Sequence, residues 1–226
     1  MFADVWNGHR NHRLLIGRHS ESIFNNEGVF CGSMDVPLSS SGVLQAKNMF
    51  NMIKDEDIDV VFTSSMIRSK ETAAILMQEY YEFYKKRWPI FVKDDFVYNE
   101  KYLPIFSDKR LNERCYGVLE GTKKKQAIIK YGNHQLFEWR RSWLATPTNG
   151  ESLKSVCDRV RLFLDEKVKP LLNNKSVMII CHQNTMRAIR IVIDNICPDG
   201  VESIEFDNSQ IIKYSYSDGL FKLVVG

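Results

Sequence analysis

The chain has no long uninterrupted run of apolar residues. The stretch 177–181 is typical of its apolar segments, and it is far too short to span a bilayer, which takes about 20 residues. Residues 1–13 also lack the apolar centre of a secretory signal, and they carry two histidines and two arginines. We therefore expect a cytoplasmic location and no membrane partner.

The chain also has few cysteines and only a small excess of positive charge. The five cysteines are odd in number, widely spaced and without a C-x-x-C pair: Cys31, Cys115, Cys157, Cys181 and Cys197. Free thiols in a reducing compartment explain this pattern most simply. No spacing of His, Cys and Asp suits a metal ion, so we expect no metal. A net charge of +3 over 226 residues is too small to indicate a nucleic-acid partner.

What the chain does have is a regular alternation of strand and helix patterns. Apolar runs at 14–16, 58–62 and 175–181 predict buried strands, and 211–216 with 220–225 predicts a terminal hairpin. Helical spacing predicts helices after an N-cap at Ser41 and over 68–84, 123–131, 135–144, 152–172 and 185–194. The alternation predicts an α/β fold with a mostly parallel sheet and helices on both faces. The length fits one domain over 1–226, with two small domains as the alternative.

The stretch 80–108 is the least regular part of the sequence. It is rich in Tyr, Phe and Lys, and Pro89 and Pro104 exclude one continuous helix. Within it only 90–92 suggests a strand, so we expect an irregular insertion here.

Polar residues follow three of the predicted strands. Arg18 and His19 come directly after the first, the segment 65–68 with Arg68 after the second, and His182 after the third. Because the carboxyl ends of parallel strands meet at one edge of a sheet, these side chains are expected to converge. An imidazole can attack a phosphoryl group, arginines can hold its oxygens, and a carboxyl such as Glu113 can exchange the proton. This inventory favours phosphoryl transfer through a phosphohistidine.

Each of these residues also has a plainer interpretation. Arg18 and His19 alone would fit a solvated pair at a strand end, and Glu113 would fit a salt bridge to Arg110 or Arg114. Residues 140–141 would fit a solvated helix face, and Cys31 would fit simple packing. The remaining histidines, His9, His12 and His134, are interpreted as surface residues.

Several segments resemble the cofactor-dependent phosphoglycerate mutases of the histidine phosphatase superfamily. Residues 18–25 (RHSESIFN) are similar to the R-H-G-E-S-x-x-N signature of that family, and 63–68 (TSSMIR) to its T-S-x-x-x-R segment. Residues 111–117 (LNERCYG) are very close to L-N-E-R-x-Y-G, which distinguishes mutases from plain phosphatases. The segments 139–142 (WRRS), 149–153 (NGESL) and 182–187 (HQNTMR) complete the series in the family's order along nearly the whole chain.

The resemblance implies the fold of the phosphoglycerate mutases and a role for each matching residue. His19 would carry the phosphoryl group, Arg18, Arg68 and His182 would surround it, and Glu113 would be the general acid and base. A second group would hold the substrate: Asn25, Cys31, Gly32, Arg114, Tyr116, Lys124, Arg140, Arg141, Gln183 and Asn184. Two family glycines beside the phosphate are replaced here, by Ser20 and Gln183.

The activity that the resemblance implies is the interconversion of 3-phosphoglycerate and 2-phosphoglycerate in glycolysis. The enzyme would be primed by 2,3-bisphosphoglycerate, would take small phosphorylated three-carbon acids as its partners, and could form a homodimer. Two alternatives stay open. One is a histidine phosphatase that hydrolyses a small phosphate ester or bisphosphoglycerate, and the other is a catalytically weak regulatory relative.

Overall fold

The computed structural model describes residues 13–224, and these contain a sheet of seven strands in the order β3-β4-β2-β5-β1-β6-β7. The strands are β1 (Arg13–Arg18), β2 (Val60–Thr63), β3 (Trp88–Val92), β4 (Tyr102–Ser107), β5 (Val177–Cys181), β6 (Ile211–Ser217) and β7 (Leu220–Val224). The first five run parallel, and β6 and β7 form the predicted antiparallel hairpin at one edge. The predicted α/β class is confirmed.

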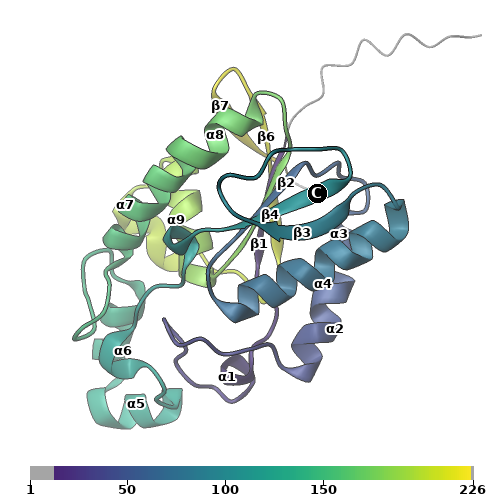
Figure 1. The fold of residues 1–226 in the computed structure, drawn as a ribbon. Coiled ribbons are helices and arrows are strands. Elements are labelled where there is room, and N and C mark those ends of the chain that lie inside the picture. Colours follow the sequence, from purple (N-terminus) through teal and green to yellow (C-terminus); the bar gives the residue numbers. More distant parts are fainter. Residues whose placement is uncertain (1–12, 225–226) are drawn as a thin grey trace, which may run out of the picture.

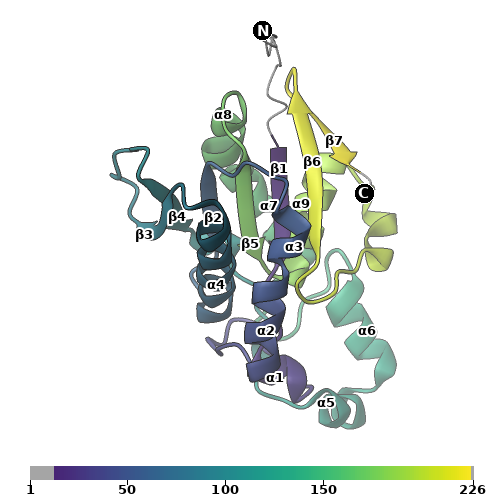
Figure 2. The ribbon, with the colours of Figure 1, turned by 90° about the vertical axis from the view of Figure 1, so that its right-hand side faces the viewer.

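Helices cover both faces of this sheet (Figures 1 and 2). One face packs against α7 (Leu153–Phe163), α8 (Lys169–Leu172) and α9 (Gln183–Asp194), and the other against α3 (Phe50–Ile53) and α4 (Ile67–Tyr84). Alternate residues of one strand serve the two cores: Leu14 and Ile16 face the first, and Leu15 faces the second. Such runs are apolar throughout because a covered parallel strand is buried on both sides.

The structure corrects several predicted boundaries. The helix α2 (Ser40–Asn48) is capped by Ser39, whose Oγ accepts the Gly42 N–H at 3.0 Å, and not by Ser41. The short helix α1 (Ile23–Asn26) begins inside a predicted loop, and α6 (Asn133–Arg141) ends three residues early. The helix predicted over 152–172 is interrupted by a π-helical turn between α7 and α8.

The stretch predicted to be irregular contains two parallel strands, β3 and β4. Sequence reasoning suggests a strand only over 90–92, which lies within β3, and takes Pro104 only as excluding a continuous helix. In β4 Pro104 lies opposite Ile90 of β3, one residue before the pairing with β2 begins at Ile105. Pro104 therefore lies just outside the register in which β4 pairs with β2.

Two smaller helices, α5 (Lys124–Tyr131) and α6, lie beyond the carboxyl ends of the parallel strands, close to α1 (Figure 1). They are attached through a small apolar cluster of Phe30, Leu119, Ala127 and Leu136. In the described range 13–224, no helix has both the length and the apolar character needed to cross a membrane.

Candidate active site

The polar strand ends converge at the carboxyl edge of the sheet, as the sequence predicts. They surround a cavity of about 80 Å³. Its wall is formed by Arg18, His19, Asn25, Val29, Phe30, Cys31, Gly32, Arg68, Glu113, Tyr116, Lys124, Arg140, Gln183 and Asn184. Residues from five separate stretches of the chain thus meet around one small polar space.

His19 is held by its own backbone in a form suited to nucleophilic attack. Its main-chain N–H donates to Cys181 O at 2.9 Å, and Nδ1 lies 2.6 Å from Ser20 O. A carbonyl oxygen only accepts, so Nδ1 carries the proton and Nε2 keeps its lone pair. Burial lowers the pKa of His19 well below 6.5, and the charges of Arg68 and Arg18 act in the same direction. The ring is therefore neutral near pH 7.

His182 lies beside His19, with 4.9 Å between the ring centroids, but it is fully buried and is not part of the cavity wall. Its Nε2 is 2.7 Å from Ser64 Oγ, which already accepts the Met66 N–H. The serine hydroxyl can then donate to Nε2, which leaves the proton on Nδ1. That Nδ1 is buried and has no hydrogen-bond partner among the described residues. In that tautomer, Nδ1–H of His182 is a donor without an acceptor in the described part of the chain, on a ring that lies beside His19.

Arg18 and Arg68 are the inner cations. Arg68 is 1% exposed and donates to Met34 O at 2.8 Å and to Gly32 O at 2.9 Å, whereas Arg18 donates to Phe206 O at 2.7 Å. In both side chains Nε is buried without a partner in the described part of the chain. A buried charged donor without an acceptor is costly. Both arginines are thus prepared for an anionic group beside His19.

Glu113 is oriented by a chain of hydrogen bonds. Its Oε1 accepts the main-chain N–H of Arg114 at 2.7 Å and Asn184 Nδ2 at 3.2 Å, and Asn184 also reaches the Tyr116 hydroxyl at 3.1 Å. Arg187 Nη1 donates to Asn184 Oδ1 at 2.9 Å. This fixes the amide so that its NH₂ faces Glu113 and Tyr116.

Sequence reasoning did not single out Arg187, although it lies one helical turn after Asn184 in α9. Arg187 is 1% exposed, and burial lowers its pKa to about 10. One sequence signal could have identified it. Arg187 follows Asn184 by three residues on a helix that begins at the site, and residues three apart share a face of a helix.

Glu120 is a second residue that sequence reasoning missed. Its carboxylate accepts the N–H groups of Ser33 at 2.8 Å and Tyr116 at 2.7 Å, joining two loops of the cavity wall. Gly32 adopts φ +50°, and a Cβ there would lie 2.1 Å from Glu120 Oε1. The glycine therefore permits the close approach.

The outer cations are distributed less evenly than predicted. Lys124 and Arg140 line the catalytic cavity and also an adjoining cavity of about 280 Å³, which Arg141 lines with Leu136 and Phe137. Burial lowers the pKa of Lys124, as do the charges of Arg140 and Arg18. Arg141 is not part of the wall of the cavity that holds His19, and its guanidinium is ion-paired with Glu205.

Arg114, which is predicted to contact substrate, lies outside the cavity wall, and its Nη1 is buried without a partner among the described residues. It is fully buried and donates to two main-chain carbonyls, Glu151 O at 2.7 Å and Ala145 O at 2.8 Å. In this structure it holds the loops behind the cavity.

The two replaced family glycines have different outcomes. Ser20 is buried outside the cavity wall, where its Oγ lies 2.8 Å from Ser209 Oγ and its N–H donates to Thr72 Oγ1 at 3.1 Å. Gln183 does line the cavity. Only the second replacement therefore alters the wall of the site.

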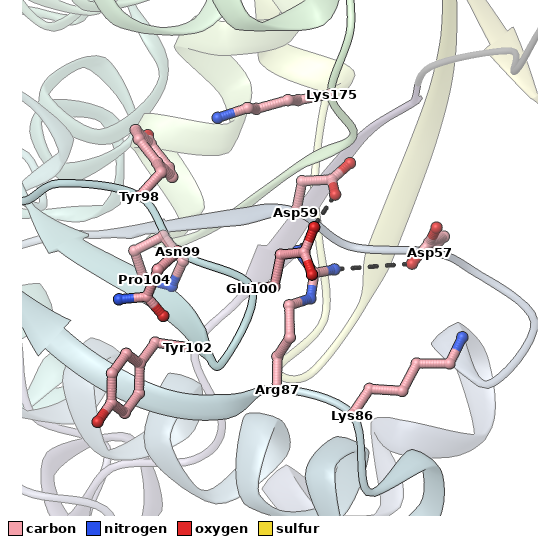
Figure 3. A pocket seen from close by; sticks show the side chains of 10 residues that line it. All are labelled: Asp57, Asp59, Lys86, Arg87, Tyr98, Asn99, Glu100, Tyr102, Pro104 and Lys175. Atoms are coloured by element: carbon pink, nitrogen blue, oxygen red, sulfur yellow. Dashed lines mark hydrogen bonds and ion pairs between the residues drawn. The ribbon is translucent and has the colours of Figure 1, made fainter.

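A larger cavity, about 530 Å³, lies at the opposite end of the parallel strands (Figure 3). Its central Arg87 pairs with Asp59 at 3.2 Å and with Asp57 at 3.7 Å, and Lys175 lies 3.4 Å above the ring of Tyr98. These charges largely satisfy one another, and no histidine or cysteine lines the cavity. Its most prominent feature is the ion cluster around Arg87.

No group of three or more His, Cys, Asp or Glu side chains within residues 13–224 is arranged to hold a metal ion. The groups that the structure brings together at the carboxyl edge are a neutral imidazole, buried guanidinium groups and one oriented carboxyl group.

Comparison with known proteins agrees with this geometry. Residues 14–85 and 96–225 match the histidine phosphatase superfamily, branch 1. A relative from Chlamydia abortus, named 2,3-bisphosphoglycerate-dependent phosphoglycerate mutase, is 34% identical over 220 residues, covering 92% of this chain and 96% of the relative. An Arabidopsis thaliana protein named 2,3-bisphosphoglycerate-dependent phosphoglycerate mutase 2 is 32% identical over 221 residues. There the match spans 92% of this chain but just under two thirds, 66%, of the relative.

Solved structures share the fold at lower sequence identity. A mycobacterial glucosyl-3-phosphoglycerate phosphatase superposes with a TM-score of 0.76 at 20% identity, covering 95% of this chain and 98% of the other. The α-ribazole phosphatase of Shigella flexneri gives 0.74 at 21% identity, covering 94% and 95%. These likenesses concern the fold alone. The family match and the relatives above 30% identity confirm the resemblance in the sequence: this chain belongs to the histidine phosphatase superfamily, alongside the 2,3-bisphosphoglycerate-dependent phosphoglycerate mutases.

Proposed function

We propose that this enzyme of the histidine phosphatase superfamily is a 2,3-bisphosphoglycerate-dependent phosphoglycerate mutase. The observation that carries the proposal is the meeting of two sets of residues in one cavity. An inner set of His19, Arg18 and Arg68 can hold and transfer one phosphoryl group, and an outer set of Lys124 and Arg140 can bind a second anion. A phosphatase requires only the inner set. A mutase also requires the outer set, because it must keep its doubly phosphorylated intermediate bound between the two transfers.

In the priming step, His19 Nε2 attacks a phosphorus of 2,3-bisphosphoglycerate. The N–P bond forms as the P–O bond to the glycerate carbon chain breaks, and the leaving oxygen takes a proton from Glu113. Arg18 and Arg68 stabilise the charge on the three transferring oxygens, and Nδ1–H of His182 is a further donor. Because Nδ1 of His19 already donates to Ser20 O at 2.6 Å, no proton has to leave the ring before attack.

In the mutase step, the hydroxyl of a bound monophosphoglycerate attacks the phosphohistidine. Glu113, now a carboxylate, takes the hydroxyl proton, and the N–P bond breaks. The resulting bisphosphoglycerate must turn in the site before its other phosphoryl group returns to His19. Lys124 and Arg140 would keep the non-reacting anion bound during that turn. The second phosphoryl transfer then occurs within one bound complex, without release and rebinding.

The test measures both outcomes in one reaction. With 3-phosphoglycerate and a trace of 2,3-bisphosphoglycerate, we expect formation of 2-phosphoglycerate to exceed release of inorganic phosphate. We also expect an acid-labile phosphoryl label on His19 that is absent in His19→Ala. If phosphate release dominates in the wild-type protein, the phosphatase alternative replaces the mutase. If no label forms at all, the alternative of a catalytically weak regulatory relative replaces the mutase assignment.

A further inference from the structure

Three consecutive residues bind three different arginines of the site. They are Ile204, Glu205 and Phe206, which we name the arginine strap and which connect the 3-10 turn η4 (Pro198–Ser203) to β6. Arg187 Nε donates to Ile204 O at 2.8 Å, and Arg18 Nη1 donates to Phe206 O at 2.7 Å. Between them, Arg141 Nη2 is ion-paired with the Glu205 carboxylate. One short segment therefore contacts the inner cations, the Glu113 network and the outer cations.

The three contacts differ in chemistry. The two outer ones use main-chain carbonyls, which every residue type supplies and which carry no net charge. The middle one uses a carboxylate, whose attraction for a guanidinium is one that a ligand carboxylate or phosphate can reproduce. The Glu205 side chain is 55% exposed and that of Arg141 only 15%, so the carboxylate is the partner that is free to move into solvent.

Arg141 is positioned for such an exchange. It ends α6, directly after Arg140, and it lines the cavity that adjoins the catalytic one and shares Lys124 with it. Arg140 and Arg141 carry like charges, and their repulsion, after burial, lowers the pKa of Arg141. Glu205 relieves this repulsion from the solvent side.

We propose that Glu205 is a specificity-determining residue, which competes with the distal anion of a two-anion ligand for Arg141. This inference rests on the proposed function, because it concerns the second anion that a mutase must retain. With Glu205 paired, the outer site presents Lys124 and Arg140. When a ligand reaches across from His19, its distal phosphate or carboxylate displaces Glu205 and recruits Arg141. A single phosphate bound beside His19 reaches neither residue and is indifferent to Glu205.

The test compares equilibrium binding of two probes, inorganic phosphate and 2,3-bisphosphoglycerate, by calorimetry. A full-length His19→Ala background prevents transfer. Adding Glu205→Gln removes the competing charge at nearly constant shape. We expect the bisphosphoglycerate to bind about two- to five-fold more tightly, the scale of one exposed ion pair, and inorganic phosphate to bind as before.

The matched control is Glu202→Gln. Glu202 lies in the same turn η4 and acts on Arg141 through its charge, but it makes no ion pair with Arg141 in the part of the chain that is described. We expect its effect on either probe to be smaller than two-fold. Combining Glu205→Gln with Arg141→Gln should abolish the gain, because no guanidinium is then left to release.

Three results would overturn the proposal: an unchanged or weaker bisphosphoglycerate affinity in Glu205→Gln, an equal gain for both probes, or a gain that survives Arg141→Gln. All three are read from binding, so they do not depend on whether the wild-type enzyme transfers phosphate to a hydroxyl or to water. A failure of the mutase assignment would appear only in the product ratio.

Discussion

At the scale of single residues, the two oxygens of the Glu113 carboxyl group have different surroundings. Its Oε1 is occupied by the Arg114 N–H and by Asn184, whereas Oε2 makes no hydrogen bond to residues 13–224. The free oxygen belongs to a residue on the cavity wall. A carboxyl with one oxygen fixed and the other open is oriented for exchange of a proton with a substrate oxygen.

Glu113→Gln should therefore lower turnover by roughly 10²–10⁴-fold, because the amide oxygen can keep both hydrogen bonds of Oε1 but the group no longer donates and accepts the proton. Binding of phosphoglycerate and the free energy of unfolding should change little. Steady-state kinetics with thermal unfolding checks this, with Glu138→Gln on α6 as a carboxylate change outside the cavity wall. Near-normal turnover would make Glu113 structural.

At the scale of elements, the start of α2 fixes the loop that follows β1. Ser39 Oγ accepts the Gly42 N–H at 3.0 Å and donates to Glu21 Oε1 at 2.7 Å. A Cβ at Gly42 would lie 2.0 Å from Glu21 O, so helix and loop are in direct backbone contact. The cap thus supports the loop that begins with His19.

Ser39→Ala should lower the free energy of unfolding by about 1 kcal/mol, the usual effect of losing an N-cap. Ser41→Ala should cost less, because Ser41 is exposed and bonds Glu21 but caps no N–H of the helix. Urea denaturation of both variants compares them directly. An equal loss of unfolding free energy in both variants, or a larger loss in Ser41→Ala, would show that Ser41 is the N-cap, as the sequence suggested.

At the scale of the whole molecule, the two ends of the parallel strands have different tasks. The carboxyl end carries the cavity around His19, and the other end carries the ion cluster around Arg87 (Figure 3). Asp59 in that cluster also accepts the Ser176 N–H at 2.9 Å, so it ties the starts of β2 and β5 together. We therefore expect that substitutions at one end can change stability without changing activity.

Arg87→Met should lower the free energy of unfolding by about 1 kcal/mol, since its partners are partly solvated, and should leave kcat/KM within two-fold of wild type. Lys86→Met is the control, because Lys86 lines the same cavity but makes no ion pair among the residues described. Denaturation curves and mutase assays on the same preparations give both quantities. A large loss of activity at unchanged stability would show that the two ends are coupled.

The sequence by itself determined the features that local physics controls. Residues 14–16 and 177–181 form strands because apolar runs bounded by polar residues have one way to be buried, and the polar residues that follow each strand then meet at one edge. The convergence of His19, Arg68 and Glu113 on one cavity followed from that edge and from the family motifs.

Only the tertiary structure decided which arginines are free to bind a ligand. Arg114 looks like a site residue in the sequence, yet distant carbonyls of the 145–151 segment hold it inside the fold. Arg141 stands next to Arg140, yet it lies outside the wall of the cavity and pairs with a carboxylate 64 positions along the chain. Periodicity and spacing report neighbours within a helix or strand, whereas the partner of a charged side chain depends on which loops the fold brings together.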